Sequence, residues 1–395
     1  MRILIHDYPG YAFPVELARA LAHRGHVVCH VHFSATIGPK GTLARMPDDP
    51  ETLEFLAIGI SGTYRKYSLL HRFLQERAYA RRLEQAVRAF SPEVVISNAQ
   101  PDIQARLLAT CQDMGIPLVH WLQDLYSTAI GNILKRKCWL LGALAGAWYR
   151  HVEKRLISGC AQVVCISDAF ASEMKDWGIP DSHVVRIDNW APLADIPVMD
   201  QDNPWSGQYG LAGVDVVLYA GTLGWKHNPA LLENLALALK ERPKTRLVVA
   251  SEGLGASWLA ERKVEQGLDN LVLLPYQPEE SFAAMLASAK VLLAILEPDA
   301  SAYSAPSKIL SYLCAGRPVV VSFPPENHSA QLLSGARAGI VCSSGDDAGF
   351  IAAVKDLLDK PENAADLAIN GRMYAERHFR IDEIVCAFER VLNHA

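Results

Sequence analysis

The chain has 395 residues, of which 50% are hydrophobic and 21% are charged, so it has the composition of a globular protein with room for two or three domains. Its formal net charge of −5 argues against a nucleic-acid partner, because such proteins hold phosphates with an excess of Lys and Arg. The 8 cysteines form no Cys-x-x-Cys pair and mostly lie in apolar runs, which indicates reduced thiols and a cytoplasmic location.

Strand-like runs alternate with helical patterns from the first residues onward. RILIHDY lacks the layout of a signal peptide and predicts a first strand, which is followed by the helical FPVELARALAHRG and the strand HVVCHVHF. A polar stretch at 34–49 precedes a long helix at 68–90, the strand EVVISN, a helix near 101–114 and the strand PLVHWL. AQVVCIS, a helix that opens at Asp168, and HVVRID complete this half. The alternation predicts a parallel sheet with helices on both faces.

Residues 191–213 interrupt this alternation, because they are rich in Pro and Gly and have little periodicity, as is typical of a linker. The alternation then restarts with the strands DVVLYAG, RLVVAS, NLVLLP, KVLLAIL and RPVVVS, with helical patterns between them. The remainder of the chain reads as helical and closes with IDEIVCAFERVLNHA. We therefore predict two Rossmann-like, doubly wound parallel-sheet α/β domains that face a central cleft.

Ligands of open parallel sheets bind outside the carboxyl ends of the strands. Five segments occupy such ends in the two predicted sheets, namely 8–11, 98–101, 123–126, 221–226 and 305–308. If the two domains face each other, all five segments line one cleft.

The segment VVLYAGTLGWKHN is the first of two candidate phosphate-binding turns. Gly221 permits close backbone approach, Thr222 offers a hydroxyl, and Lys226 supplies charge at the start of a helical pattern. Backbone N–H groups and a cation that meet at one point suit a phosphate. The alternative is an ordinary strand–helix connection with an exposed lysine, since a single glycine turn is weak motif evidence.

The second candidate turn, from Ala305 to Lys308, precedes the apolar helix ILSYLCAG. Pro306 in the first turn is pre-organised for a helix, and the N–H groups of Ser307 and Lys308 then point at an anion that the helix dipole favours. Alone, this turn predicts only a helix start. Together, the two turns predict a diphosphate-bearing ligand, and so a nucleotide.

Two carboxylates at strand ends are candidates for polar contacts with substrate. Glu252, beside Gly253, follows the strand RLVVA, where an acidic side chain can hydrogen-bond a ribose hydroxyl or simply lie exposed in a loop. Asp124 follows the strand PLVHWL and can bind an acceptor hydroxyl, steady a cationic centre or cap the next helix. His120, inside the same strand, is interpreted as a core histidine.

The sequence favours neither a metal centre nor a membrane span. His26, His30 and His32 share one face of a strand, but no carboxylate or cysteine at suitable spacing completes a ligand set. The apolar run CWLLGALAGAWY is shorter than a membrane span needs. Basic residues flank it, so the segment 135–155 predicts either a helix that lies on a membrane surface or a helix buried between neighbours.

Several of these segments resemble the retaining glycosyltransferases of family 4. The similarity is carried by HWLQDLYS, EKRLISGCAQVVCISDAFASEMKDWGIP, VVLYAGTLGWKHN, VVASEGLG and SAPSKILSYLCAGRPVV, and is clearest from Pro117 to Leu392. It looks closest to the bacterial branch that acts in exopolysaccharide and O-antigen assembly, the colanic-acid transferase type. The resemblance implies the GT-B architecture, with an acceptor-binding domain at 1–190, a linker at 191–213, a donor-binding domain at 214–375 and a closing helix, 376–395, that packs back on the first domain.

The resemblance also implies an activity, the transfer of a sugar from a UDP-sugar to a saccharide or polyprenyl-linked acceptor with retention of configuration. Lys226 and Lys308 would stabilise the leaving diphosphate, and Asp124 would act on the acceptor side. No cofactor and no metal would be required, and the protein would work in the cytoplasm, at the inner face of the membrane. The implied donor-binding residues are Gly221, Thr222, Glu252, Gly253, Tyr276, Pro306, Ser307 and Ser311. The implied acceptor-side residues are Gly10, Tyr11, Asn98 and Gln123.

The chain departs from the family pattern at four positions. The family commonly has two glutamates eight residues apart where this chain has Tyr303 and Ser311, an arginine where it has Thr222, and a histidine where it has Gln123. At these positions the chain therefore offers other side chains to the donor sugar than the family does. Two alternatives therefore stay open, a nucleotide-sugar 2-epimerase of the same architecture and a non-catalytic nucleotide-sugar-binding partner of another transferase.

Overall fold

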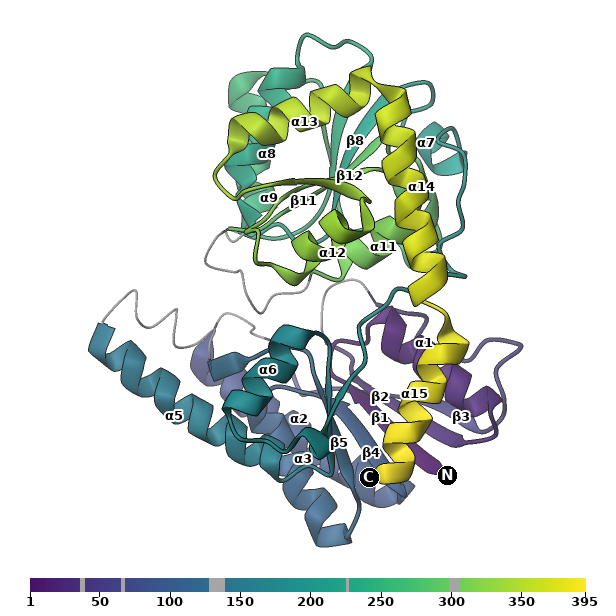
Figure 1. Cartoon of the computed structure of the whole chain (residues 1–395), viewed down its shortest axis with the longest axis vertical. Coiled ribbons are helices and arrows are strands. Elements are labelled where there is room, and N and C mark those ends of the chain that lie inside the picture. The colour runs from purple at the N-terminus through teal and green to yellow at the C-terminus, as the bar shows by residue number, and fades with distance from the viewer. Residues whose placement is uncertain (36–39, 65–67, 128–138, 225–226, 298–305) are drawn as a thin grey trace. The chain divides into compact units, whose positions relative to one another are not determined.

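A computed structural model describes residues 1–35, 40–64, 68–127, 139–224, 227–297 and 306–395 of the chain (Figure 1). The chain divides into two compact units, the first formed by residues 1–189 together with 381–395 and the second by residues 190–380. Each unit is a parallel β-sheet with helices on both faces, so the predicted pair of doubly wound α/β domains is confirmed.

The sheet of the first unit has seven strands in the order β3-β2-β1-β4-β5-β6-β7. The chain runs outward from β1 to β3 and then returns to the other side of β1, so the order reverses between β1 and β4. These strands are β1 (Arg2–Asp7), β2 (Val27–Phe33), β3 (Leu53–Ile58), β4 (Val94–Asn98), β5 (Leu118–Leu122), β6 (Gln162–Cys165) and β7 (Val184–Arg186).

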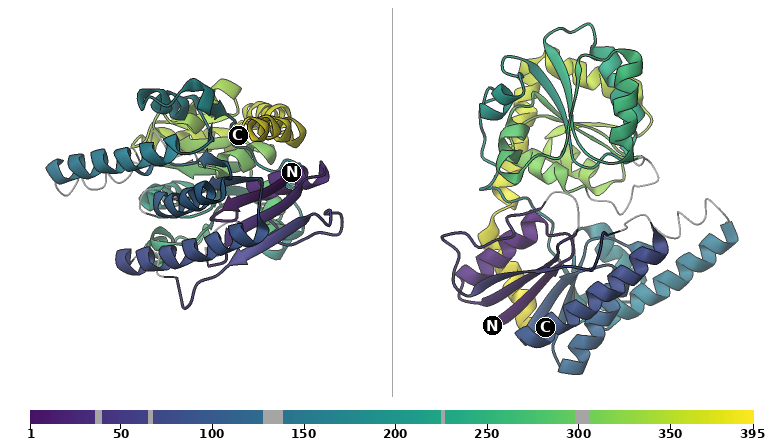
Figure 2. Two further views of the ribbon diagram at one scale, coloured as in Figure 1. Left: turned by 90° about the horizontal axis from the view of Figure 1, so that it is seen from below. Right: turned by 180° about the vertical axis from the view of Figure 1, so that it is seen from behind.

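Two groups of helices cover the two faces of this sheet (Figures 1 and 2). One face carries α2 (Leu69–Phe90), α3 (Pro101–Met114), α5 (Trp139–Ser158) and α6 (Asp168–Asp176), which lies beside α5; the other carries α1 (Ala12–His23) and α15 (Ile381–His394). A short 3₁₀ turn, Asp181–His183, precedes β7.

The last helix, α15, is part of the first unit although it follows the whole of the second. Its Phe388 packs edge-on against Trp121 of β5, with ring centroids 4.9 Å apart, and its Glu389 forms an ion pair with Arg24 at 2.8 Å. Helix α15 also lies along α1. These contacts complete one face of the first sheet.

The sheet of the second unit has six strands in the order β10-β9-β8-β11-β12-β13, which reverses between β8 and β11. Its strands are β8 (Asp215–Ala220), β9 (Thr245–Ala250), β10 (Leu271–Leu274), β11 (Val291–Ile295), β12 (Val319–Ser322) and β13 (Gly339–Cys342). Its helices are α7 (Pro204–Gln208), α8 (Pro229–Leu239), α9 (Leu254–Gln266), α10 (Glu279–Ala287), α11 (Lys308–Cys314), α12 (His328–Ala336), α13 (Asp347–Asp359) and α14 (Pro361–His378).

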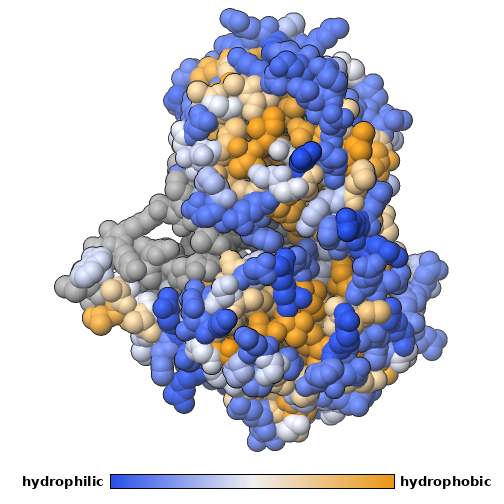
Figure 3. Space-filling model, in the orientation of Figure 1, coloured by the Kyte–Doolittle hydropathy of each residue, from blue (hydrophilic) through white to orange (hydrophobic). Residues whose placement is uncertain are grey.

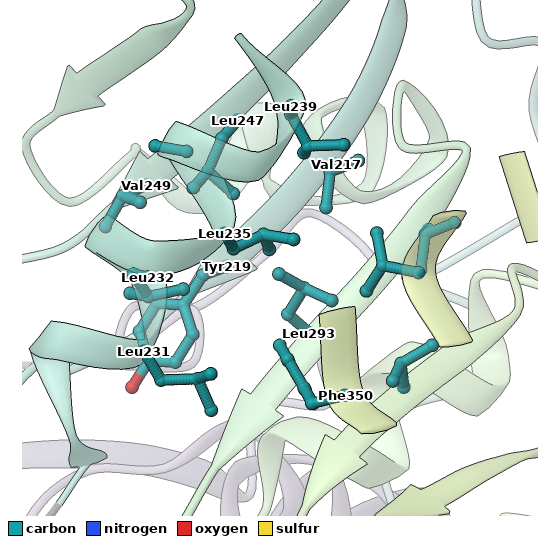
Figure 4. Close-up of a cluster of buried hydrophobic side chains, with 14 of the residues drawn as sticks. Val217, Tyr219, Leu231, Leu232, Leu235, Leu239, Leu247, Val249, Leu293 and Phe350 are labelled. Atoms are coloured by element: carbon teal, nitrogen blue, oxygen red, sulfur yellow. The ribbon is translucent and has the colours of Figure 1, made fainter. Parts of the chain in front are cut away.

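The core of the second unit lies between its sheet and helices α8, α9 and α13. Val217 and Tyr219 of β8 pack there against Leu231 and Leu235 of α8 and Phe350 of α13 (Figure 4). Strands buried on both faces read as continuous apolar runs, which is why the sequence marks β8, β11 and β12 clearly.

The structure differs from the sequence interpretation at three places. Residues 191–213, predicted as a linker, group with the second unit, where Trp205 is buried and its indole N–H donates to the Gln277 side chain at 3.0 Å. Strands β3 and β13 were not expected, because both are edge strands with partly exposed side chains. The predicted closing helix 376–395 is two helices, since α14 ends at His378 and α15 begins at Ile381.

On the face drawn in Figure 3, hydrophilic residues predominate, and apolar residues group near the middle of each unit. Three of the exposed large apolar side chains lie on α5, namely Trp139, Leu144 and Trp148. Within the described ranges, no helix combines the length and the apolar character that crossing a bilayer demands.

Candidate active site

Most of the predicted donor-binding residues lie at the carboxyl ends of the strands of the second sheet. Gly221 and Thr222 follow β8, Glu252 and Gly253 follow β9, and Tyr276 follows β10. Pro306 and Ser307 precede α11, the helix that lies between β11 and β12 in the chain. The sheet order reverses between β8 and β11, and ligands of open α/β sheets bind at such a switch point.

The side chain of Lys308 occupies this switch point. Gly221 has φ +113°, and a Cβ atom built there would lie 3.2 Å from both Cε and Nζ of Lys308. The ammonium group is shielded from solvent and lies 3.9 Å from the ring centroid of Tyr219, in cation–π geometry. Because Gly221 has no side chain, the turn after β8 leaves room for the Lys308 ammonium group, which comes from a separate segment of the chain.

Tyr312, which the sequence analysis did not single out, anchors α11 beneath this lysine. Its hydroxyl accepts a hydrogen bond from the backbone N–H of Ala220 at 3.1 Å, and it lies 3.2 Å from the carbonyl oxygens of Ala220 and Leu293. One buried hydroxyl thus joins the end of β8 to the middle of β11. The signal in the sequence is a tyrosine one helical turn after Lys308 in an otherwise apolar helix.

Two predicted donor-binding residues also meet at this edge. The Thr222 hydroxyl and the Tyr276 hydroxyl are 2.6 Å apart, and the Tyr219 hydroxyl donates to the Thr222 carbonyl at 2.9 Å. Thr222 and Glu252 are exposed, so their side chains face solvent at the strand ends.

The glycines after β9 are required by the packing of α9 against the first turn. A Cβ atom on Gly253, which has φ +120°, would lie 2.9 Å from the Leu223 carbonyl oxygen, and one on Gly255 would lie 2.7 Å from it. The Gly255 N–H donates to this same carbonyl at 2.9 Å, and the Leu223 N–H donates to the Glu252 carbonyl at 3.1 Å. The two turns are therefore held together by their backbones.

Replacing Gly255 by alanine should destabilise the second unit by about 1–3 kcal/mol, the usual effect of overpacking a site whose nearest neighbour is backbone. The matched control is Gly335→Ala in α12, where a Cβ atom meets nothing within 4 Å. That change should be neutral or stabilise by roughly 0.5–1 kcal/mol, because alanine is the better helix former. Denaturant unfolding measures both, and equal midpoints for the two variants would contradict this account.

The corresponding edge of the first sheet is organised by Asp7, a residue the sequence analysis missed. Its buried carboxylate accepts hydrogen bonds from the Asn98 side chain at 2.9 Å and from the Tyr11 N–H. Burial raises the pKa of Asp7 to about 7. Gly10 has φ +80°, and a Cβ atom there would lie 2.9 Å from a methyl group of Leu43. Gly10, Tyr11 and Asn98 thus lie together, and Gly10 is required by the turn itself.

Gln123 and Asp124 follow β5 at the same edge. The Gln123 amide exchanges two hydrogen bonds with the Asn189 amide, at 3.1 and 2.6 Å. Asp124 is exposed and lines a small cavity with Gln104, His120 and Glu153. Together these contacts fix the start of the loop that carries Asp124.

Family models match both units of the chain. Residues 13–194 match Glycosyltransferase Family 4, and residues 214–360 match Glycosyl transferases group 1. A search of curated protein sequences found no match. The chain is a glycosyltransferase of the GT-B fold.

Solved glycosyltransferase structures support the same fold at low sequence identity. Anabaena Alr3699/HepE in complex with UDP and glucose aligns over 100% of this chain and 99% of its own, with a TM-score of 0.73 and 15% identity. Sucrose-phosphate synthase (tll1590) from Thermosynechococcus elongatus aligns over 100% and 98%, with a TM-score of 0.73 and 16% identity. WaaG, a glycosyltransferase involved in lipopolysaccharide biosynthesis, aligns over 97% and 98%, with a TM-score of 0.67 and 14% identity.

The backbone of the first turn of this glycosyltransferase differs from the predicted phosphate cradle. The N–H groups of Gly221, Leu223 and Gly224 donate to the Ala250 carbonyl, the Glu252 carbonyl and Nδ1 of His227. These three donors are satisfied inside the protein, and the sequence analysis missed the part played by His227. Charge at this turn must therefore come from side chains.

The helix after the first turn begins later than predicted, whereas the helix after the second turn begins within one residue of its predicted start. Helix α8 begins at Pro229 behind an Asn228 cap, so Lys226 precedes this helix; Lys226 itself lies outside the described residues. Helix α11 begins at Lys308, and the Ile309 and Leu310 N–H groups donate to the carbonyls of Pro306 and Ser307, so these two residues lie at its first turn as predicted. Ser311 lies half-buried in this short helix, and Tyr303 is outside the described residues.

Proposed function

We propose that this glycosyltransferase moves a sugar from a UDP-sugar to a saccharide or lipid-linked saccharide acceptor, with retention of configuration, in the biosynthesis of a cell-surface polysaccharide. The observation that carries the proposal is the Lys308 ammonium group beside Gly221, at the switch point of the second sheet. The donor assignment is supported by HepE, a structure of similar fold that was solved with UDP-glucose. The polysaccharide role is supported by WaaG, which acts in lipopolysaccharide biosynthesis.

In this proposal Lys308 stabilises the diphosphate as it leaves the sugar, with Lys226 as the second cation. Preorganised charge aimed at the group that gains charge is usually the largest single contribution to catalysis. Thr222, Tyr276 and Glu252 would bind the nucleotide and its ribose at the strand ends of the second unit. Asp124, Asn98 and Tyr11 would receive the acceptor at the edge of the first unit.

We further propose that the enzyme works without a metal ion, since lysine side chains take the place of a cation at the diphosphate. Among the described residues, no three His, Cys, Asp or Glu side chains come together in a way that would hold a metal. Transfer should therefore persist undiminished in EDTA. Loss of activity in EDTA, with recovery when Mg²⁺ or Mn²⁺ is added back, would contradict metal independence.

The function is tested with free nucleoside diphosphates and with donor alone. UDP at about 100 times its dissociation constant should stabilise the protein by roughly 2.7 kcal/mol in a thermal-shift assay. A UDP-sugar incubated with an acceptor should then yield a glycoside with the anomeric configuration of the donor, as read by NMR. An epimerised sugar formed from donor alone would favour the epimerase, and UDP binding without any transfer would favour the non-catalytic partner.

We also propose that α5 carries the enzyme to anionic membranes. Leu144 and Trp148 are 69% and 61% exposed and lie one turn apart, while Arg150, Lys154 and Arg155 are exposed further along the same helix. An apolar end beside basic residues suits a helix that lies at a lipid surface.

The double replacement of Leu144 and Trp148 by glutamate should abolish co-flotation with liposomes that contain anionic lipid. It places two negative charges at the membrane surface and removes the apolar anchor. Replacing Val264 by glutamate on α9, where the side chain is 82% exposed, is the matched control and should leave flotation unchanged. If the wild-type protein fails to float with either neutral or anionic liposomes, the membrane proposal is wrong.

A further inference from the structure

A chain of buried hydrogen bonds runs through the first unit beneath its carboxyl edge. The Tyr79 hydroxyl lies 2.8 Å from Nε2 of His6, whose Nδ1 lies 2.9 Å from the Ser97 hydroxyl. Ser97 is 2.8 Å from Oε1 of Gln104, and Nε2 of Gln104 is 2.9 Å from Nδ1 of His120. All five side chains are buried, and they come from five elements: α2, β1, β4, α3 and β5.

The amide of Gln104 gives this chain a direction. Its NH₂ group can only donate, so Nδ1 of His120 accepts and the proton of a neutral His120 ring resides on Nε2. The Gln104 oxygen can only accept, so the Ser97 hydroxyl donates to it and must itself accept a hydrogen bond from Nδ1–H of His6. Nε2 of His6 is then left to accept the Tyr79 proton. The two histidines therefore carry opposite tautomers.

Neutral rings suit this chain, because both histidines lie away from solvent. Burial lowers the pKa of His6 to about 3 and the pKa of His120 to about 4. Both therefore keep a single ring proton, and so a defined donor and acceptor side, at neutral pH.

This chain of hydrogen bonds ends at the cavity that Asp124 lines. Gln104, His120, Asp124 and Glu153 all border this cavity, whose volume of about 20 Å³ is enough for one water molecule. Glu153 holds the loop after Asp124, since its carboxylate accepts the N–H groups of Tyr126 and Ser127 at 2.8 and 2.9 Å. A water there would have three polar partners among the residues that line the cavity, the His120 ring and the carboxylates of Asp124 and Glu153, which meets the two to four that a buried water needs.

We propose that the chain from Tyr79 to His120 holds one ordered water in this cavity, and that this water orients the Asp124 carboxylate toward the acceptor. His120 is thus a positioning residue that acts through the water, and the chain fixes its tautomer. The inference rests on the proposed function, in which Asp124 binds the acceptor. Its first test does not depend on that function.

The first test is the ¹⁵N spectrum of the histidine rings in the wild-type protein at neutral pH. We expect Nδ1–H in His6 and Nε2–H in His120, with each ring assigned by its replacement with glutamine. The reverse pair, His6 with Nε2–H and His120 with Nδ1–H, would mean that the chain runs the other way and would overturn the proposal. This readout needs no substrate, so it is decided whether or not the protein transfers sugar.

The second test replaces Gln104 by glutamate, which has the same shape but no N–H to donate. His120 should then move its proton to Nδ1 and lose the donor that faces the cavity. We expect kcat/KM for the acceptor to fall about tenfold, the usual effect of one lost hydrogen bond to a charged group, while the Kd for UDP stays unchanged. Unchanged acceptor kinetics in a variant whose His120 tautomer has switched would remove the role in positioning Asp124.

A matched control separates this effect from the general effect of a buried carboxylate. Gln162, at the start of β6, is buried in the same unit, and its amide donates to the Ser182 carbonyl at 3.3 Å. Gln162→Glu should lower stability without changing the tautomer of either histidine. A tautomer change in this control would show that the histidines respond to any loss of stability, which would also overturn the proposal.

Discussion

Replacing Lys308 by alanine is expected to weaken UDP binding by about 10- to 100-fold and to lower the rate of sugar transfer by about 10²–10³. The first figure is the usual worth of a hydrogen bond to a charged group, and the second is the usual loss when one preorganised donor to the developing charge is removed. The effect should be large because the ammonium group is shielded from solvent beside Gly221, where salt and water weaken its field little. Isothermal titration with UDP and steady-state kinetics measure the two quantities.

Lys290 provides the matched control for this experiment. It lies at the opposite, amino-terminal end of β11 in the same unit and forms an ion pair with Asp215 at 2.8 Å. Lys290→Ala removes the same charge from the unit, so it should change stability by no more than about 1 kcal/mol and leave UDP binding intact. If both variants lose UDP affinity equally, the phosphates are not at the switch point and the proposed donor site is wrong.

Acidification from pH 6.5 to pH 4.5 is expected to destabilise the first unit by about 3–4 kcal/mol per pH unit, enough to unfold it. His6, His30, His32 and His120 are buried, and burial lowers the pKa of each to between about 3 and 4. Histidine in the unfolded chain has a pKa of about 6.5, so below this pH the unfolded chain binds protons that the folded unit does not bind. The free energy of unfolding therefore falls as the pH falls. The loss ends only near the folded pKa values.

Buried carboxyl groups offset part of this proton uptake. Burial raises the pKa of Asp7 to about 7 and also raises the pKa of Glu153. These groups hold protons in the folded unit that the unfolded chain releases above its own carboxyl pKa of about 4, so they favour folding as the pH falls. About two to three net protons therefore remain, at roughly 1.4 kcal/mol per proton and pH unit.

Urea unfolding at pH 7, 6 and 5, followed by a probe within the first unit, measures the slope. The variant His30→Phe isolates one histidine, because neither ring nitrogen of His30 has a hydrogen-bond partner among the described residues. It should be neutral or stabilising at pH 7 and should reduce the slope by about 1.4 kcal/mol per pH unit. A stability that does not change between pH 7 and pH 5 in the wild type would contradict the buried neutral state of these rings.

The sequence predicts the two sheets well because their central strands are buried on both faces. RILIHD, VVISN and DVVLYA are continuous apolar runs bounded by polar or small residues, and each is a central strand. Strand β3 has the sequence LEFLAI and exposes three of its six side chains at the sheet edge. Its buried and exposed residues neither alternate nor form a continuous buried run, so the sequence pattern did not predict a strand there. Residues 191–213 contain Pro and Gly at a density typical of a linker, yet packing of Trp205 against the second unit overrides the local signal.

The position of the candidate site was predicted from the rule that ligands of open parallel sheets bind outside the carboxyl ends of the strands. The hydrogen bonds within the site were not predicted. That rule placed Gly221 and Lys308 at one edge, and the structure brings the lysine within van der Waals distance of the glycine turn. Which backbone N–H groups remain for a ligand depends on tertiary partners, such as the Glu252 carbonyl and Nδ1 of His227, that no local pattern reveals. Asp7 and Tyr312 were missed for the same reason, since their roles arise from residues about 90 positions away.

Because α15 belongs to the first unit, residues 190–380 are in effect inserted between two parts of it. On the ribosome, the inserted unit has its complete sequence before the enclosing one does. Until residues 381–395 have been synthesised, Trp121 and one side of α1 lack the helix that covers them. A premature stop just before Ile381 would therefore leave the later-made unit intact and the earlier-made unit incomplete, a nascent chain that chaperones would have to shield.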